Sequence, residues 1–204
     1  MDHWRILAVS AGLLALAGCG GMSANECELA DWRAVGYEDG ANGQSTDRFG
    51  SYRKRCAKHE VSPDFQAYKS GRNEGLREYC QPANGYREGT RGVRYVGVCP
   101  ADLEPAFMAS YSDGRELYQL ESAVRTTSAQ IKRRKTRMDE IEGELTGVMA
   151  DALSNNTSGE ERAALLVKTK QLAEERVTLG NEVDELEDKL ERRREELEAF
   201  RAQM

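Results

Sequence analysis

The sequence contains few aromatic residues and almost no histidine. Aromatic side chains make up 7% of the 204 residues, whereas charged side chains make up 31%. This is thin core material for such a length, so we expect part of the chain to be extended helix rather than packed globule. Beyond the N-terminal segment the single histidine is His59, placed between Lys58 and Glu60 as a surface side chain would be. Catalytic arrangements built on a histidine base are therefore not expected, and we predict no enzyme activity.

Basic residues are in the minority. The chain has 29 Lys and Arg against 35 Asp and Glu, which gives a formal net charge of −6. Binding driven by counterion release needs a basic footprint. We therefore predict no nucleic-acid partner.

Motifs for cofactors and metals are also missing. The glycines from Gly85 to Gly92 are not followed by Gly-Lys-Ser/Thr, so they do not form a phosphate loop. No Cys-x-x-Cys pair is present, which argues against a zinc site. Asp31, Asp39 and Asp64 could serve as acid and base in sugar cleavage, but Asp31 and Asp64 are better explained as helix caps. We predict no catalytic residue, no metal and no cofactor.

The chain begins with an apolar run from Ile6 to Leu16. This run is too short to span a bilayer permanently and is typical of a signal peptide, here residues 1–18. The letters LAGC that end at Cys19 resemble a bacterial lipobox. The resemblance implies that the signal is removed and that Cys19 carries acyl chains such as palmitate, with residues 19–26 as a lipidated linker. An uncleaved or conventionally cleaved signal is the alternative.

The residue after the acylated cysteine indicates which of the two bacterial membranes would hold the protein. Two or more acyl chains on one residue give stable anchoring. In sorted lipoproteins, Asp at this position favours retention in the inner membrane, whereas this chain has Gly20. The resemblance therefore implies an outer-membrane lipoprotein that faces the periplasm.

Four further cysteines predict disulfide bonds. Cys27, Cys56, Cys80 and Cys99 are an even number in an oxidising compartment. Four cysteines allow three pairings. Cys27 with Cys56 and Cys80 with Cys99 is the favoured pairing, because each bond then closes a local loop flanked by its own turn residues. Each bond would contribute roughly 3 kcal/mol on the loop-entropy model.

A Tyr-x-x-Gly unit occurs four times, at Tyr37–Gly40, Tyr68–Gly71, Tyr86–Gly89 and Tyr111–Gly114. The second unit lies in a predicted helix with Ser62 as its cap and Pro63 at its first position. Gly71 and Gly75 share one face of that helix, where each costs about 1 kcal/mol relative to alanine. We therefore expect another backbone or a tyrosine ring to pack closely on them. The third unit, Gly85 to Gly92, is predicted to form turns that lead to a short strand over Val93 to Val98.

These residues resemble a known family. The resemblance to the bacterial lipoprotein family catalogued as domain of unknown function 2799 covers about residues 27–125. It is carried by Cys27, Asp31-Trp32, Gly36, Asp39-Gly40, Gly43, Cys56, Pro63-Asp64, Tyr68, Gly71-Arg72, Gly75-Leu76, Tyr79-Cys80, Gly85-Tyr86, Gly89, Gly92, Tyr95, Cys99-Pro100, Phe107, Tyr111 and Gly114-Arg115. The resemblance implies an envelope location and disulfides, but no activity, substrate or catalytic residue.

The C-terminal half has coiled-coil periodicity. Starting from Leu117 as position a, nine of the eleven a and d positions up to Ala152 are apolar, with Thr127 and Arg134 as the exceptions. A second series from Leu165 to Met204 is also mostly apolar at a and d. Ser158 and Glu161 form a capping box between the two series. The pattern predicts an antiparallel helical hairpin, although the same seam could pair with a second copy.

The predicted fold is mainly α. A small glycine-rich, disulfide-linked Tyr-x-x-Gly domain over residues 27–115 is followed by the coiled-coil hairpin over residues 116–204. The basic run from Lys132 to Arg137 is expected to lie opposite Glu182, Asp184 and Glu185 in the hairpin.

Two functions are compatible with this organisation. The first is a non-enzymatic outer-membrane lipoprotein that presents its coiled-coil arm to a periplasmic protein or to a copy of itself. The alternative is a module that binds peptidoglycan or another carbohydrate through a surface made by Trp32 and the tyrosines. Aromatic rings that are buried cannot also stack on sugars, so the exposure of Tyr68, Tyr86 and Tyr111 bears on the choice.

Overall fold

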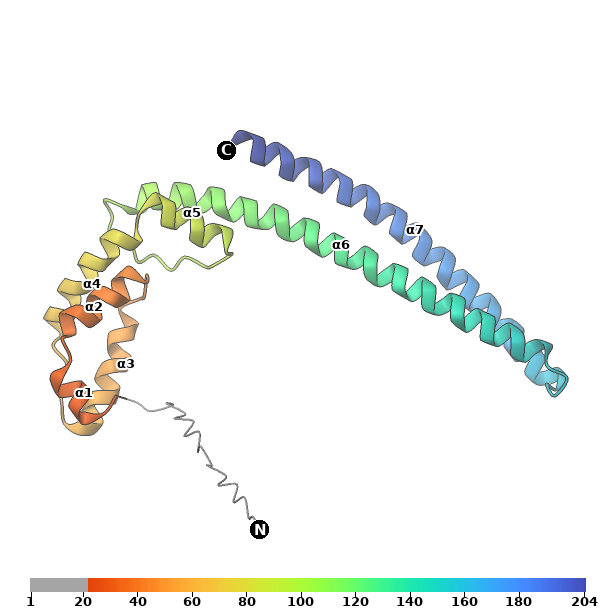
Figure 1. Ribbon diagram of the computed structural model, residues 1–204, viewed down its shortest axis with the longest axis horizontal. Helices are drawn as coiled ribbons and strands as arrows, with labels where there is room; N and C mark the ends of the chain where they lie inside the picture. The colour runs from red at the N-terminus through yellow and green to blue at the C-terminus, as the bar shows by residue number, and fades with distance from the viewer. Residues whose placement is uncertain (1–21) are drawn as a thin grey trace, which may run out of the picture. The chain divides into compact units, whose positions relative to one another are not determined.

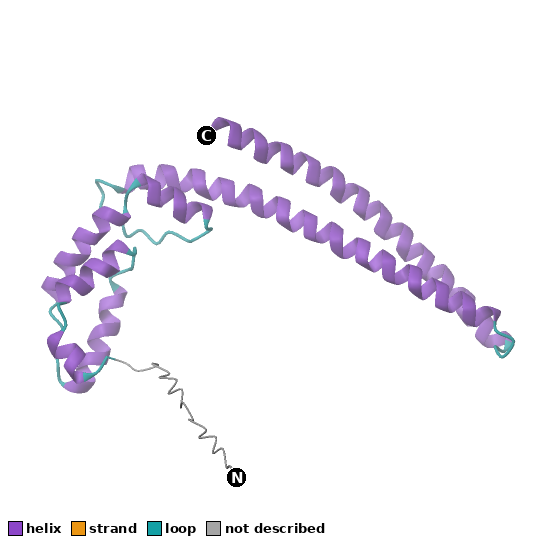
Figure 2. Ribbon diagram, in the orientation of Figure 1, coloured by secondary structure: helices purple, strands orange, loops and turns teal. Residues whose placement is uncertain are grey.

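The computed structural model describes residues 22–204, and this range is helical with connecting loops (Figures 1 and 2). The predicted signal peptide and Cys19 lie outside the described residues. The chain divides between Glu78 and Tyr79 into two compact units. None of the helices in the described part is long and apolar enough to cross a membrane. The predicted fold class is confirmed.

The first unit is built from short helices. They are α1 (Ala24–Leu29), α2 (Trp32–Ala41), α3 (Asp47–Cys56), the 3-10 turn η1 (Ala57–His59) and α4 (Phe65–Tyr79), which ends at the division. Asp31 caps α2 by accepting bonds from the N–H groups of Arg33 and Ala34.

The predicted start of α4 is wrong by two residues. The Asp64 carboxylate accepts bonds from the N–H groups of Gln66 and Ala67, at 2.8 and 3.0 Å. Asp64 is therefore the cap in place of Ser62, and Pro63 precedes the helix instead of opening it. A carboxylate at the N-terminus also interacts favourably with the helix dipole, which a serine hydroxyl does less strongly.

Helices α2 and α4 touch through their backbones. A Cβ atom placed on Gly71 would lie 1.9 Å from the carbonyl oxygen of Arg33, and one on Gly36 would lie 2.0 Å from that of Tyr68. Gly40 and Gly75 make equally close approaches further along the same crossing. The close contact expected at Gly71 and Gly75 is thus made by the backbone of α2.

Aromatic rings and a disulfide fill the rest of this unit. Trp32, Phe49 and Tyr68 pack together with the bond between Cys27 and Cys56. The buried Asp39 carboxylate accepts hydrogen bonds from the phenols of Tyr68, at 2.8 Å, and Tyr52, at 3.2 Å. Burial and the bond to Asp39 raise the pKa of Tyr68, so the phenol stays a donor at neutral pH.

The second unit contains α5 (Pro82–Thr90), α6 (Glu104–Leu153) and α7 (Gly159–Gln203). The prediction of turns over Gly85 to Gly92 is wrong, because most of these residues belong to helix α5. A Cβ atom on Gly89 would lie 2.4 Å from the carbonyl oxygen of Tyr111, and one on Gly114 would lie 2.3 Å from that of Tyr86. Close packing of α5 on α6 therefore offsets the poor helix propensity of its glycines.

The strand predicted over residues 93–98 is also wrong. This segment is a loop, and the range from 22 to 204 holds no strand with which it could pair. The Tyr111 hydroxyl instead donates to the carbonyl of Val93 and accepts from the N–H of Tyr95. Gly92 begins the loop with a φ of +72°, and a Cβ there would meet the ring of Tyr118 at 2.5 Å. The disulfide between Cys80 and Cys99 closes the loop.

The glycine crossing predicts a stability difference between two matched substitutions. Gly71→Ala places a methyl group against the Arg33 carbonyl, so we expect a loss of about 3 kcal/mol. Gly50→Ala in α3 meets no atom within 4 Å, and its better helix propensity should stabilise the protein by up to about 1 kcal/mol. Chemical denaturation followed by the fluorescence of the buried Trp32 measures both. Equal effects of the two substitutions would contradict a backbone contact at Gly71.

The disulfides predict a second pair of measurements. The Cys27–Cys56 and Cys80–Cys99 bonds span 29 and 19 residues, so losing either should cost about 3.5 kcal/mol through loop entropy. Cys27→Ser with Cys56→Ser should shift the Trp32 denaturation curve by that amount. In the wild type, intact mass after alkylation without reductant should show no added mass. One alkylated cysteine among the four would overturn the scheme of two bonds.

Candidate functional site

The hairpin formed by α6 and α7 is the candidate functional site. Figure 1 shows the two helices running side by side in opposite directions. One apolar cluster holds Ile141, Val148 and Leu172, and a second holds Ile131, Val183 and Leu190. All six are a or d positions of the two heptad series, and Val124 packs against the second cluster with Leu190. The predicted seam is therefore the contact between the helices.

Polar residues interrupt the seam in pairs. The Arg193 guanidinium donates to the hydroxyl of the fully buried Thr127 and, at 3.0 Å, to the carbonyl oxygen of Ala123. Arg134, the other polar residue in the first series, donates to Glu182 of α7. Thr127, Arg193 and Arg134 thus carry interactions between the helices, which favour one register over others. The Thr169 hydroxyl instead donates to the Leu165 carbonyl of its own helix.

The turn at the end of the hairpin is held by hydrogen bonds. Ser158 and Glu161 form the capping box predicted from the sequence. The Arg162 guanidinium donates to backbone carbonyls at the end of α6 and in the turn, those of Ala152, Ser154 and Thr157. These bonds satisfy carbonyl groups that the last turn of α6 would otherwise expose.

Ion pairs link the outer edges of the two helices. Arg137 bonds to Glu144 of its own helix and to Glu175 of α7, at 2.7 and 2.9 Å, and Lys135 bonds to Glu187 at 2.6 Å. The bond with Glu175 raises the pKa of Arg137, and the same bond lowers the pKa of Glu175. The basic run therefore faces acidic residues of α7, as predicted. Glu175 and Glu187 serve in addition to Glu182, whereas Asp184 and Glu185 take no part.

The acidic residues considered for sugar chemistry have structural partners. Asp31 and Asp64 cap helices, and Asp39 accepts from two phenols. The His59 ring lies 3.1 Å from the backbone carbonyl of Met22 and is exposed. Over residues 22–204, no group of three or more His, Cys, Asp or Glu side chains is placed to hold a metal. The structure brings none of the predicted polar candidates together as a reactive centre in that range.

The aromatic residues considered for sugar binding are buried or half-buried. Trp32 is 7% exposed and Tyr68 is fully buried. Tyr86 and Tyr111 are half-buried, and the Tyr111 hydroxyl is bonded to the loop backbone. These rings therefore offer little free face for stacking on a sugar.

Part of the chain matches a known family. Residues 31–116 match a family described as a protein of unknown function, DUF2799. The chain carries a DUF2799 domain. Neither a curated protein nor a solved structure matches the chain. The match confirms the predicted DUF2799 domain over residues 31–116, which include the glycine crossings and the loop, and most of the hairpin lies beyond it.

One set of candidate residues was missed from the sequence. Met149, Leu153, Leu166, Val167 and Val177 are large apolar side chains of the hairpin that remain more than half exposed. The heptad count considers only positions a and d, so it assigns no role to these residues. Reading the b and e positions together on both helices would have found four of them.

The seam predicts that one polar substitution will unfold the hairpin. Leu172→Asp puts an unpaired charge beside Ile141, which should cost at least about 3 kcal/mol. Far-UV helicity should fall sharply while the near-UV tyrosine signal of the first unit persists. Val167→Asp is the matched control because Val167 is 57% exposed on the same helix. A cysteine pair at positions 141 and 172 should close within one chain, and closure only between chains would contradict the hairpin.

Proposed function

We propose that this protein is a non-enzymatic lipoprotein, anchored through Cys19 to the periplasmic face of the outer membrane, whose hairpin arm binds another protein. That protein is either a periplasmic partner or a second copy. The anchor is supported by the LAGC letters, by Gly20 and by the short apolar run before them. The four remaining cysteines, which pair in the structure, fit an oxidising compartment.

The main support for a binding role is the length of the arm and its close packing. Helix α7 has 45 residues, which at 1.5 Å per residue gives about 68 Å. It packs on α6 through its own seam, its ion pairs and a bonded turn, so the arm does not need a partner to hold its shape. Most of its remaining surface is exposed along its whole length. An extended rigid surface of this kind suits recognition of another protein better than it suits catalysis, which needs an enclosed site.

The carbohydrate alternative has less support. Sugar binding by stacking needs exposed aromatic faces, whereas Trp32 and Tyr68 are in the core of the first unit. The half-buried Tyr111 is committed to the loop between α5 and α6. Burial of these rings weighs against a stacking surface.

The anchor predicts the behaviour of two neighbouring substitutions. Cys19→Ala removes the acylation site, so the protein should lose its label with a palmitate analogue and appear either soluble in the periplasm or with its signal uncleaved. Gly20→Asp keeps the acylation site, so the label should remain while the protein moves from the outer to the inner membrane fraction. Labelling and membrane fractionation measure both. Absence of label on the wild type would overturn the proposed location.

A further inference from the structure

The two sides of the hairpin differ in the apolar residues that they expose. In a heptad, positions b and e of both antiparallel helices lie on one side of the seam, and positions c and g lie on the other. We call the first side the open face. It carries Met149, Leu153, Leu166 and Val177, which are 54%, 77%, 61% and 65% exposed. None of the large exposed apolar residues of α6 and α7 lies at c or g.

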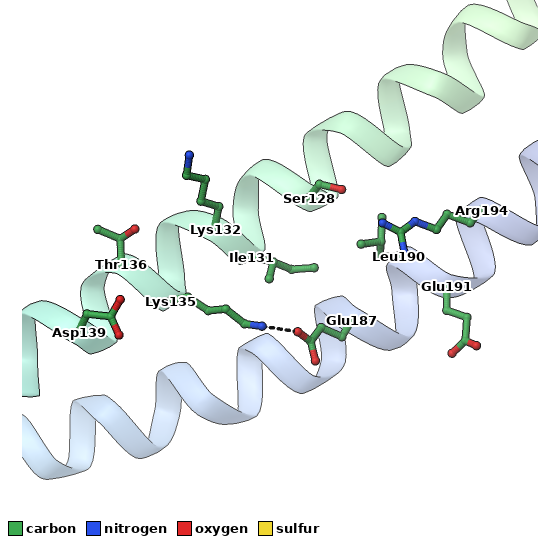
Figure 3. A pocket seen from close by; sticks show the side chains of 10 residues that line it. All are labelled: Ser128, Ile131, Lys132, Lys135, Thr136, Asp139, Glu187, Leu190, Glu191 and Arg194. Carbon is green, nitrogen blue, oxygen red and sulfur yellow. Dashed lines mark hydrogen bonds and ion pairs between the residues drawn. The ribbon is translucent and has the colours of Figure 1, made fainter.

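Contacts between the helices confirm which residues share a side. Lys135 and Glu187, both at position e, form an ion pair, and Arg137 and Glu175, both at position g, form another. A groove between the helices is lined from α6 by residues that include Ser128, Lys132 and Lys135, and from α7 by Glu187, Glu191 and Arg194 (Figure 3). Of the residues that line this groove, those outside positions a and d are mostly b and e residues, so the groove lies on the open face.

Each helix carries charges of both signs at the b positions of the open face, including Asp139 on α6 and Lys170 on α7, but away from the turn the signs are separated. There α6 carries Arg125 and Lys132 at b positions, whereas α7 carries Asp184 and Glu191. Within residues 22–204, Lys132, Asp184 and Glu191 form no ion pair, and the single one of Arg125 is with Glu121 on its own helix. Three of these four charges therefore lack an opposite charge in the chain itself.

We propose that the open face binds the open face of a second copy, with the two hairpins parallel and a two-fold axis along the arm. The inference rests on the proposed function, because it names the partner of the same arm. A two-fold axis along the arm places α6 of one copy on α7 of the other at equal height. An axis across the arm would instead lay α6 on α6, so basic segments would meet basic segments wherever the charged parts overlap.

Equal heights follow from the seam. Ile131 packs near Val183 and Ile141 near Leu172, so each step along α6 corresponds to one step back along α7. In the parallel pair, Lys132 then lies opposite Asp184 of the second copy, and Arg125 lies opposite Glu191. Nearer the turn, Met149 lies opposite Leu166, and Leu153 lies opposite Ala163. In the middle of the arm Asp139 lies opposite Val177, so the complementarity is carried by the opposite charges away from the turn and by the apolar side chains at the turn.

The size of the open face is sufficient for a stable pair. It is about 68 Å long and two helices wide, roughly 20 Å. Stable interfaces bury about 800 Å² on each partner. Contact along most of the arm exceeds that area, and the apolar end would bury Met149, Leu153 and Leu166, which the hairpin leaves in water.

The expected result is a dimer that depends on matched charges. Sedimentation equilibrium of the full acylated protein in density-matched detergent should give twice the monomer mass. Lys132→Glu or Asp184→Lys should each weaken the dimer roughly tenfold, since each dimer contains the pair twice. The double variant should restore the wild-type constant. These two residues lie at outer b positions on different helices, so rescue reports contact between copies. A monomeric wild type, or a double variant as weak as the sum of the single variants, would overturn the proposal.

An apolar substitution supplies a matched control. Leu166→Asp should dissociate the dimer, whereas Val167→Asp, at a neighbouring residue outside the open face, should leave it intact. Both side chains are exposed, so helicity should be unchanged in either variant. Equal effects of the two substitutions would overturn the assignment of the face.

A photo-activated cross-linker in intact cells separates this proposal from the proposed function. Placed at residue 177 on the open face, it should give a product of two copies, and placed at residue 185 on the opposite side, it should not. A product at 177 that contains only a different protein would overturn the second copy as partner and leave the proposed function standing. No product at these or any other outward-facing positions of the arm would overturn both.

Discussion

Contact between helix backbones is the constraint on which the first unit and the root of the hairpin depend. With few aromatic and apolar side chains available, α2 approaches α4 and α5 approaches α6 until carbonyl oxygens fill the places of missing Cβ atoms. Such an approach gains dispersion contacts from the backbone itself, which every residue possesses. It also explains why glycine stands at matching positions of two helices rather than one, because a Cβ on either side of the crossing would separate them.

Each unit combines a glycine crossing with a buried aromatic ring and a disulfide bond. In the first unit the crossing lies beside Tyr68 and the Cys27–Cys56 bond, and in the second unit beside Phe107 and the Cys80–Cys99 bond. The polar groups that such small cores enclose are satisfied locally, as Asp39 is by two phenols. Because an unpaired buried carboxylate would be costly, these hydrogen bonds stabilise Asp39 in the core.

Sequence patterns predicted the hairpin well and the glycine-rich helices poorly. Heptads and the Ser158 capping box are local signals whose meaning does not depend on distant residues, so the seam and the turn could be located. Helix α5 could not be located in this way. Its glycines have low helix propensity, and only close packing on α6 offsets that cost. Residues 93–98 do not form the predicted strand, because no strand within residues 22–204 lies beside them and the backbone groups of Val93 and Tyr95 bond to the Tyr111 hydroxyl instead. The residues of the open face could be located from the sequence, but they occupy heptad positions b and e, which do not form the seam.

The polar residues of the seam determine which residues of the arm face outward. Arg193 with Thr127 and Arg134 with Glu182 lower the stability that an all-apolar seam would give, yet each can be satisfied in only one register. A slip of one residue in either helix would turn its outward-facing positions by about 100°. Met149 and Leu166 would then no longer share a side, and Lys132 would move away from the height of Asp184. Recognition on the outer surface therefore requires the register that the inner polar pairs specify, which gives a reason for a hairpin to keep charged residues where leucine would be more stable.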